Sequence, residues 1–351
     1  YYREHPIVDT VSLRQSAGAA SCVGRLGPES AHAPPRPAGF MTPPASTARR
    51  IDILAAARGF PPLVTAVAHP CDAPSLEATL VARDQGLIDP ILVGPPEKIR
   101  AVAAVAGLDL GGVPIDPVPH SHAAAIRVVE LVRRAEAAAI MKGSLHTDEL
   151  MSEVVKAESG LRTARRISHV FVMEIPSLDR LLLVTDGAVN IEPSLEVKAD
   201  IVRNAIDLAI ALGIVTPRVA ILSAVETVTS KLRSTLDAAA LCKMADRGQI
   251  EGGILDGPLA FDNAVSLAAA RTKGIVSPVA GRADILVAPD LESGNILAKQ
   301  LEYFAGATAG GIVLGGRVPI ILSSRADPLK SRVLSCAVAV LVVHARHVAA
   351  G

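Results

Sequence analysis

The sequence predicts an α/β fold in which helices cover both faces of a mostly parallel sheet. Half of the 351 residues are hydrophobic but only 2% are aromatic, so the core must consist of Ala, Val, Leu and Ile side chains. Short aliphatic runs alternate with longer helical stretches, which is typical of parallel sheets with crossover helices. Most of the runs are continuously apolar, as expected for strands buried on both faces. A β-sandwich or an aromatic nucleic-acid-binding module is therefore disfavoured.

The strands are predicted where aliphatic runs end in polar loops. In chain order these runs are residues 63–68, 91–93, 137–141, 170–173, 181–184, 219–222, 253–255, 285–288, 312–314 and 320–322.

Helices are predicted between the strands. The clearest spans residues 195–212, where apolar side chains recur at helical spacing, Ser194 stands at the N-cap position and Gly213 follows the last turn. Residues 123–139 and 237–247 show a similar period.

Charge and cysteine usage exclude several classes of protein. Lys+Arg and Asp+Glu both number 35, so the net charge is +0, and no nucleic-acid partner is predicted. The longest apolar run near the end, residues 333–343, is too short to cross a bilayer, so no membrane partner is predicted. Cys22, Cys71, Cys242 and Cys336 form no CxxC pair, which favours reduced thiols in a cytoplasmic protein.

The first 48 residues differ from the rest of the chain. They include a proline-rich stretch over residues 33–39 and show no sustained period. We expect a disordered extension there, outside the fold.

Polar residues follow seven of the predicted strands, at residues 69–72, 142–147, 185–190, 223–227, 256–263, 289–295 and 323–327. Ligands of open α/β sheets bind at the carboxyl ends of strands, so we expect an active site there. The sequence has no GxGxxG motif after the first strand, no P-loop, no HExxH and no GxSxG. The pair His120 and His122 fits a polar helix cap better than a metal site, and no metal is predicted.

The residue types in these loops suit a phosphorylated or oxyanionic substrate. Lys142 and Ser144 offer a cation and a hydroxyl at a strand end, and Arg325 follows Ser324 in the same kind of place. The alternatives are a solvated lysine, an N-cap serine and a salt bridge between Arg325 and Asp327. Likewise the basic residues at 162, 165 and 166, and the aspartates at 186, 256, 262 and 290, fit either substrate binding or solvated charges and turns.

Four segments resemble the phosphate acetyltransferase/phosphate butyryltransferase family. They are residues 142–147 (KGSLHT), 277–281 (SPVAG), 289–295 (PDLESGN) and 323–327 (SSRAD), and the resemblance extends from about residue 61 to residue 343. It is strongest to the short branch found fused behind an enoyl-CoA hydratase domain.

This resemblance implies a two-domain α/β/α fold similar to isocitrate and isopropylmalate dehydrogenases, with a cleft between the domains. The first domain would comprise residues 49–160 plus 319–351, and the second residues 161–318. The implied enzyme is a cytoplasmic homodimer that transfers a short acyl group reversibly between coenzyme A and inorganic phosphate. The thiolate of coenzyme A would attack acyl phosphate directly, with coenzyme A as a substrate and no resident cofactor.

The resemblance also implies the site residues. Arg325 would bind phosphate and stabilise the carbonyl oxygen, Ser324 would bond near the thiol, and Asp327 is the nearest carboxylate to serve as base. The substrate-binding residues would be Lys142, Ser144, His146, Thr147, Arg162, Arg166, Asp186, Asn190, Asp262, Asn263, Ser277, Asp290, Gly294, Asn295 and Lys299.

The sequence departs from the longer acetyltransferases at two places. Their proposed thiol base lies seven residues after the serine, where this chain has Ser331, and an arginine of theirs is replaced by Glu153. These departures keep open a catalytically silent module that binds coenzyme A. The other alternative is a decarboxylating dehydrogenase of similar fold that uses a nicotinamide cofactor.

Overall fold

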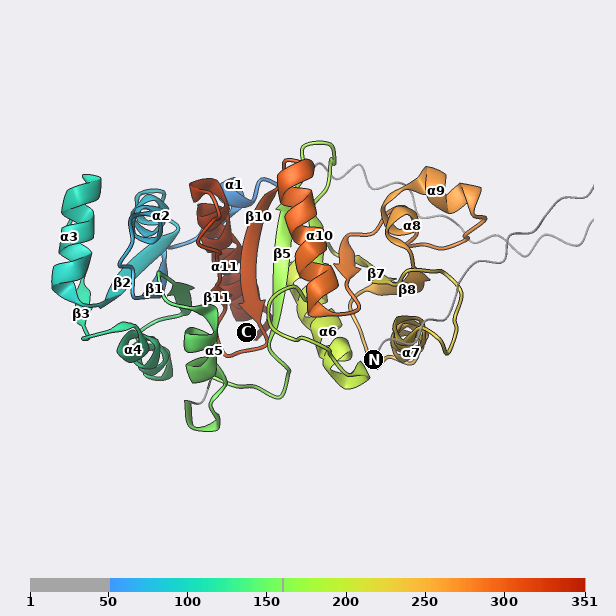
Figure 1. Ribbon diagram of the computed structural model, residues 1–351, viewed down its shortest axis with the longest axis horizontal. Coiled ribbons are helices and arrows are strands. Elements are labelled where there is room, and N and C mark those ends of the chain that lie inside the picture. Colours follow the sequence, from blue (N-terminus) through green and yellow to red (C-terminus); the bar gives the residue numbers. More distant parts are fainter. Residues whose placement is uncertain (1–50, 160, 351) are drawn as a thin grey trace, which may run out of the picture. The chain divides into compact units, whose positions relative to one another are not determined.

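Eleven strands form one sheet in the part of the chain that this computed structural model describes, residues 51–159 and 161–350 (Figure 1). The predicted extension and Cys22 lie outside the described residues. The strands are β1 (Leu63–Ala68), β2 (Ile88–Gly94), β3 (Ile115–Pro117), β4 (Ala139–Lys142), β5 (Ser168–Glu174), β6 (Leu182–Thr185), β7 (Arg218–Leu222), β8 (Ile254–Leu259), β9 (Ile285–Val287), β10 (Thr308–Leu314) and β11 (Ile320–Ile321).

The sheet is mostly parallel, as predicted. Its order is β3-β2-β1-β4-β11-β10-β5-β6-β9-β7-β8. Only the pairs β11–β10, β10–β5 and β5–β6 are antiparallel among the described strands. Strand β11 pairs with β4 on one side and with β10 on the other, so the end of the chain inserts into the middle of the sheet. The proposed boundaries of two domains stay a prediction.

Helices cover both faces of the sheet. They are α1 (Ile53–Ala57), α2 (Ala73–Asp84), α3 (Pro96–Ala106), α4 (Ser121–Arg133), α5 (Thr147–Val155), the 3₁₀ turn η1 (Ala157–Ser159), α6 (Leu195–Ala211), α7 (Arg233–Asp246), α8 (Phe261–Val265), α9 (Leu267–Thr272), α10 (Leu291–Phe304) and α11 (Leu329–Ala350).

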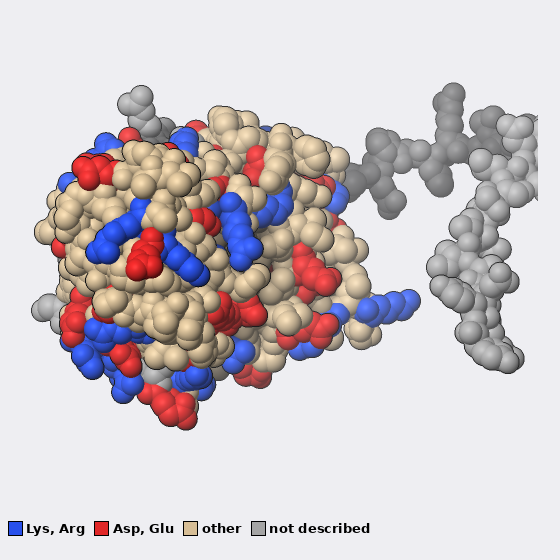
Figure 2. Space-filling view, turned by 60° about the vertical axis from the view of Figure 1, so that its left-hand side comes forward, with Lys and Arg blue, Asp and Glu red and all other residues tan. Residues whose placement is uncertain are grey.

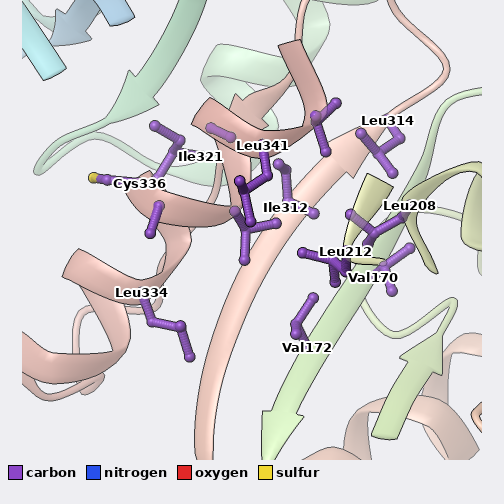
Figure 3. Packing of buried hydrophobic residues seen from close by; sticks show 14 of the residues in the cluster. Val170, Val172, Leu208, Leu212, Ile312, Leu314, Ile321, Leu334, Cys336 and Leu341 are labelled. Atoms are coloured by element: carbon purple, nitrogen blue, oxygen red, sulfur yellow. The ribbon is translucent and has the colours of Figure 1, made fainter. Parts of the chain in front are cut away.

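One face of the sheet carries a continuous apolar core. Helices α1, α2, α3, α6, α7 and α11 pack there on alternate residues of the strands. Figure 3 shows its centre, where Leu341 of α11 lies beside Ile312 of β10, and Leu208 of α6 lies beside Val170 of β5. Helix α11 contains the long apolar run of the sequence, and no helix of the described residues is long and apolar enough to cross a membrane.

The opposite face carries two separate apolar cores. Helices α4 and α5 cover one of them, and α8, α9 and α10 cover the other. Lys142, His169 and Phe171 occupy this face near the junction, because they alternate along β4 and β5 with residues of the continuous core. The polar loops after β4 and β11 begin at this junction. Figure 2 shows Lys and Arg side chains interspersed with Asp and Glu, in line with the balanced charge.

Several sequence expectations about elements were wrong. Strand β8 continues to Leu259, so Asp256 lies within a strand and not in a loop. Gly257 and Pro258 suggested a strand end, but β8 is an edge strand, where proline is tolerated. Helix α4 ends at Arg133, well before residue 139. Strand β3, also at an edge, was not predicted because its sequence Ile-Asp-Pro carries almost no apolar pattern.

Candidate functional site

The loops that follow β1, β4 and β11 meet at the junction of the two smaller cores. Arg325, from the loop after β11, is exposed and donates from Nη2 to the carbonyl oxygen of Ser144 at 3.4 Å. The same nitrogen lies 3.5 Å from Nε2 of His146. Thr147 opens α5 directly after His146. Residues 142–147 and 323–327, which are far apart in the sequence, therefore lie side by side.

Lys142 is a buried cation at this place, which excludes the alternative of a solvated lysine. Its side chain is 4% exposed, and Nζ donates to the carbonyl oxygens of Gly143 and Leu145 at 3.3 and 3.1 Å. Burial lowers the pKa of Lys142, and the positive charges of Arg325 and Arg332 lower it further. Arg325 contacts the Ser144 carbonyl beside this lysine, and Arg332 contacts the Arg325 carbonyl, so an anion bound at this place would be stabilised by their charges.

Ser144 bonds to the loop after β1 instead of capping α5. Its hydroxyl donates to the carbonyl oxygen of His69 at 2.8 Å and lies 3.0 Å from Nδ1 of His69. Because the hydroxyl proton is used, Nδ1 is the donor of the second contact, and Nε2 is left as an acceptor. Burial, followed by the charge of Lys98, lowers the pKa of His69, so its imidazole is neutral near pH 7. His69 is not among the site residues predicted from the sequence.

The alternative of a salt bridge between Asp327 and Arg325 is wrong, because Asp327 has other partners. Its Oδ1 lies 3.2 Å from Nζ of Lys299 on α10, and its Oδ2 accepts from the backbone N–H of Ser324 at 2.7 Å. Lys299 also pairs with Glu302 at 2.6 Å and lies 5.9 Å from the centre of the Phe171 ring. Burial acts to lower the pKa of Lys299, but the contacts with Glu302 and Asp327 outweigh it and raise the pKa.

A second polar cluster lies after β6, where Asp186 accepts four hydrogen bonds. They come from the N–H groups of Ala188, Val189 and Asn190 and from Nδ2 of Asn190. Burial raises the pKa of Asp186, although these bonds oppose the shift. Arg166 donates to Oδ1 of Asn190 at 3.0 Å.

Helix α10 links this cluster to the first. Asn295 donates to the carbonyl oxygen of Gly187 at 3.0 Å, and Lys299 lies one turn further along the helix. A Cβ at Gly294 would lie 2.3 Å from the carbonyl oxygen of Asp186, so only glycine allows this approach. Asp290 is the N-cap of α10 and accepts from the N–H of Ser293 at 2.8 Å.

The remaining predicted residues have contacts elsewhere. Asn263 donates to Glu226, and Asp262 lies 3.3 Å from Lys273. Ser277 accepts from the N–H groups of Val279 and Ala280, both at 3.0 Å, within its own turn. Arg162 is exposed and pairs by its backbone with Gly316. These contacts do not join the cluster around Arg325.

Ser331, which stands where the longer enzymes have their proposed base, lies in the first turn of α11 and is only 3% exposed. Glu153, at the position of their arginine, is buried and pairs with Lys156 at 2.6 Å. His120 caps α4, as expected, by accepting from the N–H of Ala123 at 3.1 Å. No group of three or more His, Cys, Asp or Glu side chains suited to a metal occurs within the described residues.

Comparison with known proteins settles the family. The model of a family described as phosphate acetyl/butaryl transferase matches residues 119–340. The chain belongs to this family. A phosphate acetyltransferase of Rhizobium meliloti is 60% identical over 306 residues, which cover 87% of this chain and 97% of that protein. A phosphate butyryltransferase of Clostridium acetobutylicum is 45% identical over 277 residues, or 79% of this chain and 92% of that protein.

The fold of this family member agrees with a solved structure. A branched-chain phosphotransacylase from Enterococcus faecalis V583 matches with a TM-score of 0.72 and 31% sequence identity, over 80% of this chain and 99% of the other. The family resemblance identified in the sequence and the α/β fold class are both confirmed.

Proposed function

We propose that this protein is a phosphate acetyltransferase, which transfers an acetyl group reversibly between coenzyme A and inorganic phosphate. The observation that carries the proposal is the contact of Arg325, after β11, with the carbonyl oxygen of Ser144, two residues after Lys142 at the end of β4, in a chain that is 60% identical to the Rhizobium meliloti acetyltransferase. Two convergent cations suit a substrate that carries a phosphoryl group. The family also favours this transfer over the dehydrogenase alternative.

The proposed reaction is a direct displacement at the acyl carbon. The sulfur of coenzyme A, after losing its proton, forms a bond to the carbonyl carbon of acetyl phosphate, and the carbonyl oxygen takes up the negative charge. The bond from carbon to the phosphate oxygen then breaks, and its electron pair leaves with phosphate. Arg325 would hold the phosphoryl oxygens with its planar fork of donors and stabilise the charge that develops beside them.

Ser324 and Asp327 would assist the reaction as hydrogen-bond donor and as base. The Ser324 hydroxyl would bond near the sulfur or the oxyanion, and Asp327 would accept the thiol proton. Since both oxygens of Asp327 already accept hydrogen bonds, from Lys299 and from the Ser324 backbone, the same carboxylate also anchors the loop. Coenzyme A enters this scheme as a substrate, and the scheme uses no resident cofactor.

Acetyl is proposed over butyryl because identity is higher to the acetyltransferase, 60% against 45%. A methylene group changes the discrimination of a hydrophobic pocket by only about 1–3 kcal/mol, so both acyl-CoAs should be compared as substrates. We also propose a cytoplasmic homodimer, as the sequence resemblance implies, and sedimentation of the purified protein would test the dimer.

Release of the coenzyme A thiol from acetyl-CoA on addition of phosphate, read with a thiol reagent, tests the proposed function. Release that depends on phosphate supports it. Nicotinamide reduction without any need for coenzyme A would select the dehydrogenase alternative. Binding of acetyl-CoA without turnover would select the silent module.

A further inference from the structure

Arg332, in the first turns of α11, makes four hydrogen bonds next to the candidate site and is not among the site residues predicted from the sequence. It is 3% exposed. Its guanidinium donates to the carbonyl oxygens of Ser324, Arg325 and Asp327 at 2.9, 3.2 and 3.1 Å, and to the hydroxyl of Ser323 at 3.3 Å. All of these partners lie in the loop that carries Arg325.

This arrangement is unusual for a buried charge. Buried guanidinium groups are normally paired with carboxylates, but Arg332 has no carboxylate partner among the described residues. It is satisfied by the negative ends of peptide dipoles from one short loop. Such a contact set fixes the direction of each peptide group that it touches.

The orientation of these peptides has a consequence on the other side of the loop. In a trans peptide the C=O and the next N–H point in opposite directions. Since the carbonyls of Ser324 and Arg325 point inward to Arg332, the N–H groups of Arg325 and Ala326 point outward. The N–H of Asp327 bonds back to the Ser324 carbonyl at 3.2 Å and closes the turn.

These outward N–H groups are nearly free. The N–H of Arg325 has no hydrogen-bond partner within the described part of the chain. That of Ala326 has a single long contact there, 3.4 Å to the Ser324 hydroxyl. Both residues are exposed. Two successive backbone N–H groups in a turn form a concavity that binds an anion.

We propose that Arg332 is a positioning residue that holds residues 324–327 so that the N–H groups of Arg325 and Ala326 form an oxyanion hole. The hole would bind the acyl carbonyl oxygen as it becomes negative, while the Arg325 side chain binds the phosphoryl group. This inference rests on the proposed acyl transfer. It adds the residue that orients the donors, and the donors themselves, to the groups predicted from the sequence.

The test compares Arg332→Lys and Arg332→Ala with Arg346→Ala. Arg346 lies on the same helix and also donates to two backbone carbonyls, of Gly316 and Arg317, at 3.4 and 3.3 Å, but outside the loop. For each variant, kcat, KM for phosphate, KM for acetyl-CoA and the melting temperature would be measured. Guanidinium chloride at low concentration would be added to Arg332→Ala.

The expected result is a fall in kcat of roughly 100-fold in Arg332→Ala, because a displacement of reacting groups by about 1 Å costs that much. Both KM values should change little, since the oxyanion exists only in the transition state. Guanidinium should restore part of the lost kcat, and Arg332→Lys should retain more activity than Arg332→Ala. Arg346→Ala should keep the wild-type kcat.

Three results would overturn the inference. One is wild-type kcat in Arg332→Ala. Another is an effect confined to KM for phosphate, which would place phosphate instead of the acyl oxygen at the N–H groups. The third is loss of folding in both Arg332 variants, which would assign the residue to stability of the fold. If wild-type protein shows no phosphate-dependent release of coenzyme A, the proposed function itself fails, which is a distinct outcome.

Discussion

At the scale of single residues, Arg325 lies 3.4 Å from the carbonyl oxygen of Ser144 and 3.5 Å from Nε2 of His146, and Asp327 lies 3.2 Å from Lys299. These residues, with Lys142 and Ser324, are among those predicted from the sequence; their proximity is observed, and their roles stay a prediction. His69 and Arg332 were missed. His69 stood in a recognised strand-end loop, which was a usable signal, whereas Arg332 lies inside a helix and contacts the site through backbone carbonyls. A contact between a side chain and a backbone carbonyl cannot be predicted from the types or the spacing of the residues, because every residue has a carbonyl group.

Arg325→Ala should lower turnover by roughly 100–1000-fold, because it removes a donor that strengthens in the transition state. Arg325→Lys keeps the charge but loses the planar fork, so it should recover only part of the rate. Turnover is measured as phosphate-dependent release of coenzyme A. Arg317→Ala, an exposed arginine in the turn between β10 and β11, is the matched control. Near-normal turnover in Arg325→Ala would show that Arg325 has no role in the reaction.

Asp327→Asn should lower turnover by about 100-fold or more, as expected when a general base is lost. It should also flatten the rise of rate with pH on the alkaline side, because deprotonation of the thiol then depends on solvent. Asparagine keeps one side-chain oxygen, which can still accept from the Ser324 N–H and hold the loop, whereas its amide nitrogen cannot accept from Lys299. A pH profile that is merely scaled down, with its shape unchanged, would leave Asp327 with an anchoring role only.

The cysteines in the described part of the chain should react slowly with thiol reagents. Burial raises the pKa of Cys71 to about 11 and those of Cys242 and Cys336 to about 12. At pH 8 the thiolate fraction of Cys71 is then about 100-fold below that of a free thiol with a pKa near 9, because each pKa unit is a factor of ten. Thiol titration of native Cys22→Ser protein at several pH values checks this, and the rate should rise with pH. Rapid reaction at neutral pH would contradict the burial of these thiols.

At the scale of elements, the apolar runs predicted the sheet well because its central strands are buried on both faces. Ten of the eleven strands coincide with predicted runs, and helix α6 begins after Ser194 as expected. The errors lie where no apolar pattern exists, at the edge strands β3 and β8. The antiparallel direction of β5 and β10 was also not predicted, because strand direction depends on connections and leaves no mark on the strand itself.

Strand β10 offers a test of how the sheet supports the site. A Cβ at Gly311 would lie 2.3 Å from the carbonyl oxygen of Leu322, which leads into the loop of Arg325, and 3.0 Å from Nε2 of His169. Gly311→Ala must therefore displace backbone, with an expected loss of about 1–3 kcal/mol in the free energy of unfolding and a fall in kcat.

The neighbouring glycine provides the control. A Cβ at Gly310 points to the other face, where the nearest atoms would be Cγ of Leu334 at 3.2 Å and the backbone nitrogen of Ser335 at 3.4 Å, so no atom would come closer than 3.0 Å. Gly310→Ala should therefore change both the unfolding free energy and kcat less than Gly311→Ala does. Equal effects of the two substitutions, measured by denaturant titration and by turnover, would show that Gly311 has no special link to the loop.

At the scale of the whole molecule, the division of one face explains where the site lies. The continuous core covers one face of the sheet. On the opposite face, polar and charged residues lie between the two smaller cores. The C-terminal segment is essential to this arrangement, since β11 enters the sheet between β4 and β10 and delivers Arg325 beside the β4 loop. Residues 179 and 181 positions apart thereby come into contact. Periodicity alone could not reveal this contact, whereas the family resemblance implied it.

The most direct test of this account is the rate at which the wild-type protein releases the thiol of coenzyme A from acetyl-CoA, measured with and without inorganic phosphate. The account predicts release that requires phosphate, saturates with it, and is nearly abolished by Arg325→Ala in a folded variant. Absence of phosphate-dependent release from folded wild-type protein, or undiminished release by Arg325→Ala, would contradict it.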